Sequence, residues 1–310
     1  MINHKMDLGN LAIKIMFLLQ TTAGILGNFS LLIQHLVYYA EYTLKHTDMI
    51  LMNLWGANAL IVLSVGVPYT MAAFGLKQFL NDFGCRLSLY IQRVGRSVSI
   101  GTTCFLSVFQ AINISHRESC CKDQKAKVAK YIGYSISLLW VLSMFIHFIF
   151  FVEIFLKRNS KNMTRKLDFE YCSYVNHFEI NGSVYAALVM CPEIFFSVVI
   201  VWSSGSTTVI LYRHKKRVQH IHSSQVSRRH SAESRAIKTI LSLVFSFLAF
   251  YSLSSILRGY IALLHNPSWG LVMVNRLSSL CFPSFGPFVL INHYPVMPRL
   301  RLVWMRNTNP

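Results

Sequence analysis

The chain has 310 residues, of which 53% are hydrophobic and 14% are charged, and its formal net charge at pH 7 is +18. In a soluble protein this charge would suggest a nucleic acid partner. In a chain this apolar, basic cytoplasmic loops and contact with anionic inner-leaflet lipid explain it better, so we expect membrane lipid as a partner and no nucleic acid.

Seven long apolar segments dominate the sequence, and each exceeds the roughly 20 residues that a helix needs to cross a bilayer. Backbone polar groups in lipid are satisfied only in a helix bundle or a closed barrel, and the alternating pattern of barrel strands is absent. The sequence therefore predicts an all-α membrane protein, with residues 1–310 forming a single seven-helix transmembrane domain. The predicted spans are approximately residues 11–37, 47–73, 85–115, 128–151, 184–212, 236–265 and 269–292, with a long outer loop at 152–183 and a long inner loop at 213–235.

The distribution of Lys and Arg predicts the orientation of the spans. If the N-terminus lies outside, the inner segments carry 17 of these residues and the outer segments carry 7. Cytoplasmic loops are the ones enriched in Lys and Arg. The N-terminus is therefore expected outside and the C-terminus inside.

Two cysteines and a glycosylation sequon fall on the predicted outer side. Cys85 lies at the top of the third span and Cys172 in the long outer loop, while the other five cysteines lie inside spans or on the reducing cytoplasmic side. We therefore expect a disulfide between Cys85 and Cys172 that ties the loop over the mouth of the bundle. The Asn162-Met163-Thr164 sequon in the same loop predicts glycosylation of Asn162.

Ionisable residues inside the spans are costly in lipid and usually mark functional sites. In the outer half of four spans we predict these ligand-binding residues: Arg93, Arg96, Glu193, Arg258 and Arg276. The guanidinium fork suits sulfate, phosphate or carboxylate, so an outward-facing cavity of positive potential is expected. The alternatives are interhelical pairs such as Arg96 with Glu193, and snorkelling of Arg258 and Arg276 toward the outer surface.

Four prolines lie within the spans, at positions 68, 192, 283 and 287. A proline inside a helix removes a backbone hydrogen bond and permits a kink. The segment Phe282-Pro283-Ser284-Phe285-Gly286-Pro287 is expected to break the seventh span twice.

Basic residues on the cytoplasmic side are candidates for docking a partner with acidic character: Arg117, Lys122, Arg213, Lys215, Lys216 and Arg217. The alternative for the inner loop is a solvated segment with helical extensions of the fifth and sixth spans. His214, His220 and His222 of this loop are candidate metal ligands, but no cysteine or carboxylate stands near them that would complete the site, so we expect no metal.

Enzymes, pumps and transporters fit the sequence less well than a signalling receptor. No phosphate-binding glycine loop, zinc-binding helix motif or nucleophile elbow is present, so we expect neither an enzyme nor a cofactor. The seventh span has no lysine for a Schiff base. Internal repeats, which are frequent in transporters, are also missing. A channel or transporter remains the alternative from another class.

Residues 99–115 of the third span read SIGTTCFLSVFQAINIS, which resembles the SIxTTCxLSxFQAIxIS segment of the vomeronasal type-1 receptor family. Gly27-Asn28 in the first span and Phe282-Pro283 in the seventh agree with that family as well, and the resemblance covers the full length. It implies a G-protein-coupled pheromone receptor in the plasma membrane of vomeronasal sensory neurons. The implied partners are an inhibitory-type G protein, facing the basic residues above, and volatile or sulfated small ligands such as a sulfated steroid.

The activation motifs of rhodopsin-like receptors are missing. Asn113-Ile114-Ser115-His116-Arg117 stands where such receptors usually carry Asp-Arg-Tyr, and the Asn-Pro-x-x-Tyr motif is absent from the seventh span. A bitter-taste-type receptor, which also lacks Asp-Arg-Tyr, is the alternative within the superfamily, although the third-span segment argues against it.

Overall fold

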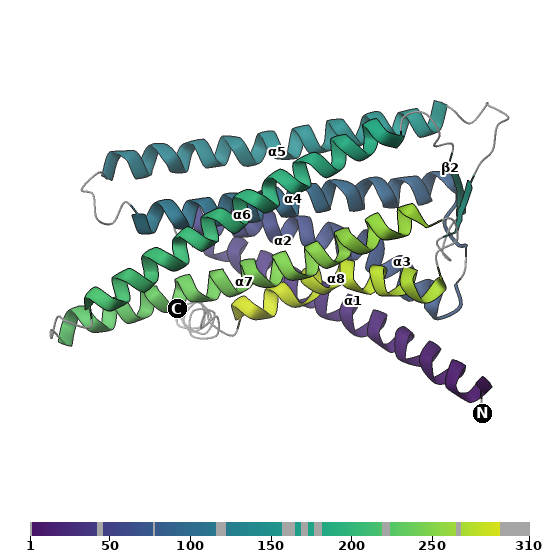
Figure 1. Cartoon of the computed structure of the whole chain (residues 1–310), viewed down its shortest axis with the longest axis horizontal. Coiled ribbons are helices and arrows are strands. Elements are labelled where there is room, and N and C mark those ends of the chain that lie inside the picture. Colours follow the sequence, from purple (N-terminus) through teal and green to yellow (C-terminus); the bar gives the residue numbers. More distant parts are fainter. Residues whose placement is uncertain are drawn as a thin grey trace, which may run out of the picture.

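The protein is a bundle of long helices lying side by side (Figure 1). The computed structural model describes residues 2–41, 46–76, 78–115, 122–156, 165–168, 173–176, 182–218, 224–264 and 268–291. The helices are α1 (Ile2–Glu41), α2 (His46–Ile61), α3 (Val67–Ala73), α4 (Asp82–Ser115), α5 (Lys122–Leu156), α6 (Gly182–Val218), α7 (Ser224–Leu263) and α8 (Trp269–Ile291). A π-helical turn, η1 (Val62–Gly66), joins α2 to α3 without a break.

Five helical segments of the described chain are long and apolar enough to cross a membrane: Leu11–Val37, His46–Ala73, Tyr131–Ile149, Cys191–Arg213 and Lys238–Ile261. The prediction of a helical membrane protein is thereby confirmed. The other two long helices, α4 and α8, carry the buried arginines Arg96 and Arg276, which lower their hydropathy. The number of seven spans and the orientation of the chain stay predictions.

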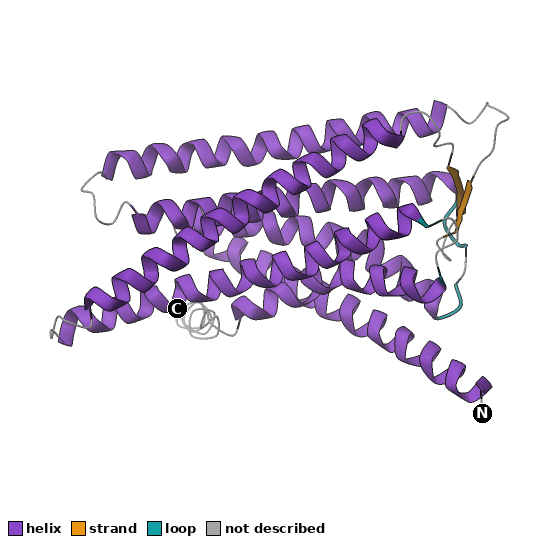
Figure 2. Cartoon of the chain, viewed as in Figure 1, coloured by secondary structure: helices purple, strands orange, loops and turns teal. Residues whose placement is uncertain are grey.

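The two ends of the bundle differ in structure. At one end, strands β1 (Arg165–Asp168) and β2 (Ser173–Asn176) form an antiparallel hairpin (Figure 2), and β2 lies against α4. At the opposite end, α6 and α7 extend into the segment predicted as the inner loop (Figure 1). The helical extensions match the alternative stated for that loop, whereas no sequence pattern indicated the hairpin.

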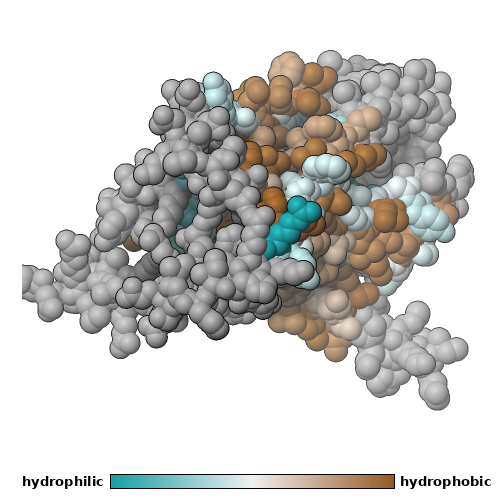
Figure 3. Space-filling view, turned by 60° about the vertical axis from the view of Figure 1, so that its left-hand side comes forward, coloured by the Kyte–Doolittle hydropathy of each residue, from teal (hydrophilic) through white to brown (hydrophobic). Residues whose placement is uncertain are grey.

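The helices bury a central core and leave an apolar outer surface. Trp55 of α2, Ile100 of α4 and Phe247 of α7 lie almost fully buried in this core. Apolar residues also cover much of the coloured part of the face in Figure 3, and Trp202 of α6 is 78% exposed. Such outward side chains fit a helix that faces lipid, because lipid tails are as apolar as a leucine side chain.

The expectation that the prolines break the seventh span is wrong, because α8 is one continuous helix with Pro283 and Pro287 inside it. Residue 287 of an α-helix would donate its N–H to the carbonyl of residue 283, but proline has no N–H. Asn28 of α1 takes over this role and donates from Nδ2 to the Pro283 carbonyl over 2.7 Å. Neighbouring helices thus satisfy carbonyls that prolines leave free, as membrane bundles require.

Pro68 of α3 receives the same kind of support, in this case from α4. In an α-helix its missing N–H would leave the carbonyl of Ser64 without a donor. The hydroxyl of Ser88 in α4 donates to this carbonyl. The π-helical turn ends at Gly66, two residues before the proline.

Replacing Asn28 with Leu is expected to lower the stability of the folded protein. The Pro283 carbonyl, buried between α1 and α8, would lose its donor, and an unsatisfied buried acceptor costs about 1–3 kcal/mol. The measurement is the melting temperature of the detergent-purified protein. Thr22→Ala is the matched control, since the exposed Thr22 hydroxyl donates to the Leu18 carbonyl of its own helix. Equal melting temperatures of both variants and the wild type would contradict this account.

Candidate functional site

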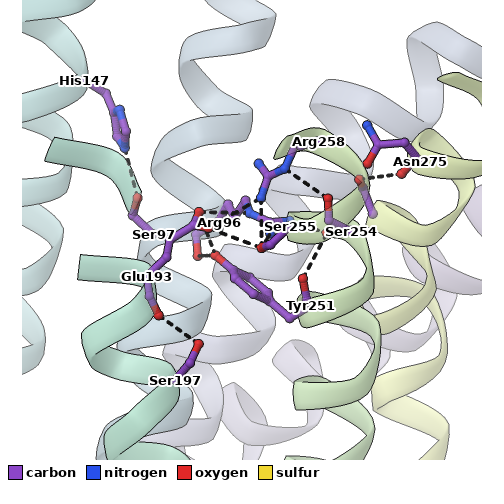
Figure 4. A network of polar contacts seen from close by, with 11 residues as sticks. Arg96, Ser97, His147, Glu193, Ser197, Tyr251, Ser254, Ser255, Arg258 and Asn275 are labelled. Carbon is purple, nitrogen blue, oxygen red and sulfur yellow. Dashed lines mark hydrogen bonds and ion pairs between the residues drawn. The ribbon is translucent and has the colours of Figure 1, made fainter. Parts of the chain in front are cut away.

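Three of the predicted charged residues meet in the interior of the bundle, each from a different helix (Figure 4). Arg96 of α4 and Glu193 of α6 form an ion pair with 3.1 Å between Nε and Oε1. Arg258 of α7 approaches the other carboxylate oxygen, with 3.5 Å between Nη2 and Oε2. We call Arg96, Glu193 and Arg258 the charge cluster.

Arg96 is held on every side of its guanidinium. Nε donates to Glu193, while Nη1 donates to Ser254 Oγ over 2.9 Å and Nη2 to Ser255 Oγ over 2.8 Å. The Cζ atom also lies 3.7 Å from the centre of the Tyr251 ring, a cation–π distance. The residue is only 8% exposed, and a charge this deeply buried needs such a complete set of partners.

Glu193 is likewise saturated with donors. Besides Arg96, the Tyr251 hydroxyl donates to Oε1 over 3.2 Å and the Ser255 hydroxyl donates to Oε2 over 3.3 Å. Its side chain is 13% exposed, whereas the Arg258 side chain is 35% exposed. The charge cluster therefore has a buried end at Arg96 and a more open end at Arg258.

The remaining two predicted arginines lie apart from the charge cluster. Arg276 of α8 is 8% exposed, with its Cζ 4.3 Å from the ring centre of Tyr69 in α3, so the snorkelling alternative is wrong for it. Arg93 of α4 is half-buried and lies within electrostatic range of His147 in α5. His147 has the polar neighbour expected of a core histidine, since its Nε2 lies 2.9 Å from Ser97 Oγ (Figure 4).

The interhelical alternative for Arg96 is thus realised, because Arg96 pairs with Glu193. Arg258 does not simply reach for solvent either, since it shares the same carboxylate. These contacts do not exclude a ligand site. They mean that the arginines are already paired within the protein.

A small cavity with both polar and apolar lining residues adjoins the charge cluster. Its lining includes Gln92, Arg96, Ser99, Tyr251 and Ser254. It measures about 20 Å³, room for one or two water molecules. Small-molecule sites usually have volumes of about 300–1,000 Å³, so a ligand at this place requires the surrounding helices to separate.

Tyr251, Ser254 and Ser255 belong to the site but were not predicted. Together with Arg258 they follow the spacing i, i+3, i+4 and i+7, which places all four on one face of α7. Polar residues at that spacing in an apolar helix are the sequence signal that could have identified them.

Several predicted residues lie outside the described residues or have side chains that are not described. Cys85 is disulfide-bonded, but Cys172 lies outside the described residues, as do Asn162 and Arg117. The strand β2 begins directly after Cys172 and lies against α4, the helix of Cys85. The other predicted docking residues lie on helices at the end opposite the hairpin (Figure 1): Lys122 at the start of α5, and Arg213, Lys215, Lys216 and Arg217 in the last turns of α6.

Comparisons with known proteins agree along nearly the whole chain. Residues 11–301 match the profile of the vomeronasal organ pheromone receptor family. The chain is 43% identical over 292 residues to vomeronasal type-1 receptor 4 of Homo sapiens, which covers 94% of this chain and 97% of the relative. It is 44% identical over 284 residues to vomeronasal type-1 receptor 2 of Homo sapiens, covering 91% and 72%. A more distant relative is olfactory receptor class A-like protein 1 of Danio rerio, 28% identical over 278 residues and covering 89% and 87%.

Proposed function

The chain belongs to the vomeronasal type-1 receptor family, and from this premise we propose that it is a G-protein-coupled pheromone receptor. In this proposal it binds a small ligand in the outer half of the bundle and activates a heterotrimeric G protein of the inhibitory type. It acts in the plasma membrane of vomeronasal sensory neurons. Family membership also argues against the bitter-taste-type alternative. The relatives are named receptors rather than enzymes.

The observation that carries this proposal is the charge cluster, because it sits where two parts of the bundle meet. The helix α6 packs extensively on α4, and α7 packs extensively on α8, whereas α7 makes few contacts with either α4 or α6. The contacts of the charge cluster connect α7 to α4 and α6. A ligand that changes the cluster would therefore change the position of α7 relative to α6.

Such a ligand shifts the receptor toward activity only if it binds the active arrangement more tightly than the inactive one. An anionic ligand, for example a sulfated steroid, would gain bidentate contacts to Arg96 and Arg258 in the arrangement that opens the cluster. Arg93 and Arg276, which the sequence also proposes for the ligand site, are not members of the charge cluster.

The proposed G-protein surface lies at the opposite end of the bundle from the hairpin. The basic residues Lys122, Arg213, Lys215, Lys216 and Arg217 sit there, and Arg117 precedes them in the chain. Because Arg213 to Arg217 lie on the extension of α6, a displacement of α6 relative to α7 would move them. The proposed disulfide between Cys85 and Cys172 and a glycan on Asn162 would lie at the hairpin end.

Calcium imaging of cells that express the chain with a promiscuous G protein tests this function. The cells are exposed to pairs of sulfated and unsulfated steroids after surface expression has been verified. We expect a response to sulfated members that disappears when the G protein is omitted. A ligand-evoked ionic current that persists without any G protein would support the channel or transporter alternative instead.

A further inference from the structure

We propose that Glu193 occupies a built-in anion site, and that the anionic group of a ligand activates the receptor by taking the place of this carboxylate. The inference rests on the proposed function for its link to signalling. The anion site itself rests only on the contacts of the charge cluster. Glu193 would then act as an internal competitor that keeps the unliganded receptor inactive.

The donors of this site come from two helices that do not include the one carrying Glu193. Arg96 belongs to α4, whereas Tyr251, Ser255 and Arg258 belong to α7. These four side chains contact the two carboxylate oxygens at 3.1–3.5 Å. The donor set would therefore remain complete if α6 withdrew its carboxylate.

The donors are also held in place by contacts that do not involve Glu193. Ser254 and Ser255 bind the two terminal nitrogens of Arg96, and Tyr251 stacks against its guanidinium. Arg258 donates from Nε to the Ser254 carbonyl over 3.3 Å. Once Glu193 has moved away, a site whose donors are fixed in this way can accept another anion of the same charge with little rearrangement of those donors.

The position of Glu193 in α6 allows its carboxylate to move out of the anion site. Glu193 follows Pro192 in α6, and a proline inside a membrane helix is a common place for a bend. Its neighbours Cys191, Ile194 and Phe195 are exposed on the outside of the bundle, and although α6 packs extensively on α4, it packs only lightly on α7. A bend at Pro192 would thus remove the carboxylate without disturbing the α4–α7 donors.

The exchange defines the ligand chemistry. A monoanion such as a sulfate ester or a carboxylate would replace the carboxylate one for one and leave both arginines paired. A neutral molecule that displaced Glu193 would leave two guanidiniums facing each other without the anion between them, which is costly in the interior. The more open end at Arg258 is the side from which the anion would approach.

The competing carboxylate lowers the apparent affinity for a ligand, since only the fraction of molecules with Glu193 displaced can bind it. Removing its charge with Glu193→Gln should therefore strengthen binding of anions. In cells, we expect this variant to respond to a sulfated steroid at about tenfold lower concentration, a typical coupling between two ligands. The concentration of the unsulfated alcohol that this variant needs for a response should not fall.

Inorganic sulfate tests the anion site without a G protein or an organic ligand. Thermal unfolding of the full chain in detergent is measured in sodium sulfate and in sodium chloride of equal ionic strength. Ligands that bind only the folded state raise the melting temperature, so sulfate should stabilise Glu193→Gln clearly more than the wild type. The added substitution Arg258→Gln should abolish that gain, and Cys191→Ser, an exposed position on the same helix, should behave like the wild type.

Equal effects of sulfate on the wild type and on Glu193→Gln would overturn the inference. If Glu193→Gln does not fold, Glu193→Asp replaces it: the shorter carboxylate holds the arginines less well, so sulfate should still stabilise it more than the wild type. The sulfate effect can succeed while steroids evoke no response, which would contradict the sulfated steroid as ligand in the proposed function but not the anion site. A steroid response without a sulfate effect would do the reverse.

Discussion

Replacing Arg96 with Gln is expected to destabilise the protein by about 3–5 kcal/mol, because one partner of a buried ion pair would be removed while the other stays buried. Glu193 would keep only Tyr251, Ser255 and the more exposed Arg258. Surface expression in cells and the melting temperature in detergent measure the loss. Arg213→Gln, an exposed arginine at the far end of α6, is the matched control and should have no comparable effect.

The double variant Arg96→Gln with Glu193→Gln distinguishes the contribution of the ion pair to stability from the contribution of side-chain packing. Both charges of the pair are then absent, so no carboxylate is left without its main partner. We expect the double variant to be clearly more stable than Arg96→Gln alone, as the non-additivity of interacting residues predicts. Equal or additive losses would mean that Arg96 contributes mainly by filling space.

Replacing Cys85 with Ser is expected to cost about 2–5 kcal/mol and to reduce the amount of receptor at the cell surface, because Cys85 is disulfide-bonded. We propose Cys172 as its partner, since β2 starts at the next residue and lies against α4. Cys172→Ser and the double variant should then lose the same amount as Cys85→Ser. Surface labelling of intact cells measures all three.

Cys191→Ser is the control for these variants, because Cys191 is a free and exposed cysteine. A double variant that is far worse than either single variant would show that Cys85 and Cys172 act independently. The pairing would also be contradicted if Cys172→Ser reached the surface at wild-type levels.

The helices and part of the site follow from the sequence because both depend on local composition. Runs of apolar residues predicted the helices, and a lone carboxylate among buried arginines suggested the pairing of Arg96 with Glu193 as the alternative to a ligand site. The continuity of α8 was not predictable in the same way. The donor that supports it comes from Asn28, 255 residues away in the chain, and no local pattern reports such a contact.

The directions of the arginine side chains and the size of the cavity could not be predicted from the sequence either. Arg93 and Arg96 are three residues apart on α4, which places them on the same side of that helix, but only Arg96 belongs to the charge cluster and contacts α6 and α7. Which neighbour a long side chain reaches depends on how the helices pack. Similarly, the same polar residues could line a ligand cavity or close on one another, and here Glu193 closes the site.

Arg258 and the rest of the charge cluster are proposed to bind the anionic group of the ligand. Dose–response curves of the wild type and of Arg258→Gln, recorded with a sulfated steroid and with its unsulfated alcohol at equal surface expression, test it most directly. A hydrogen bond to a charged group contributes about 1.5–3 kcal/mol, so the potency of the sulfated compound should fall about 10- to 100-fold while that of the alcohol stays nearly unchanged. Equal losses for both compounds would contradict the claim and leave the charge cluster with a structural role alone.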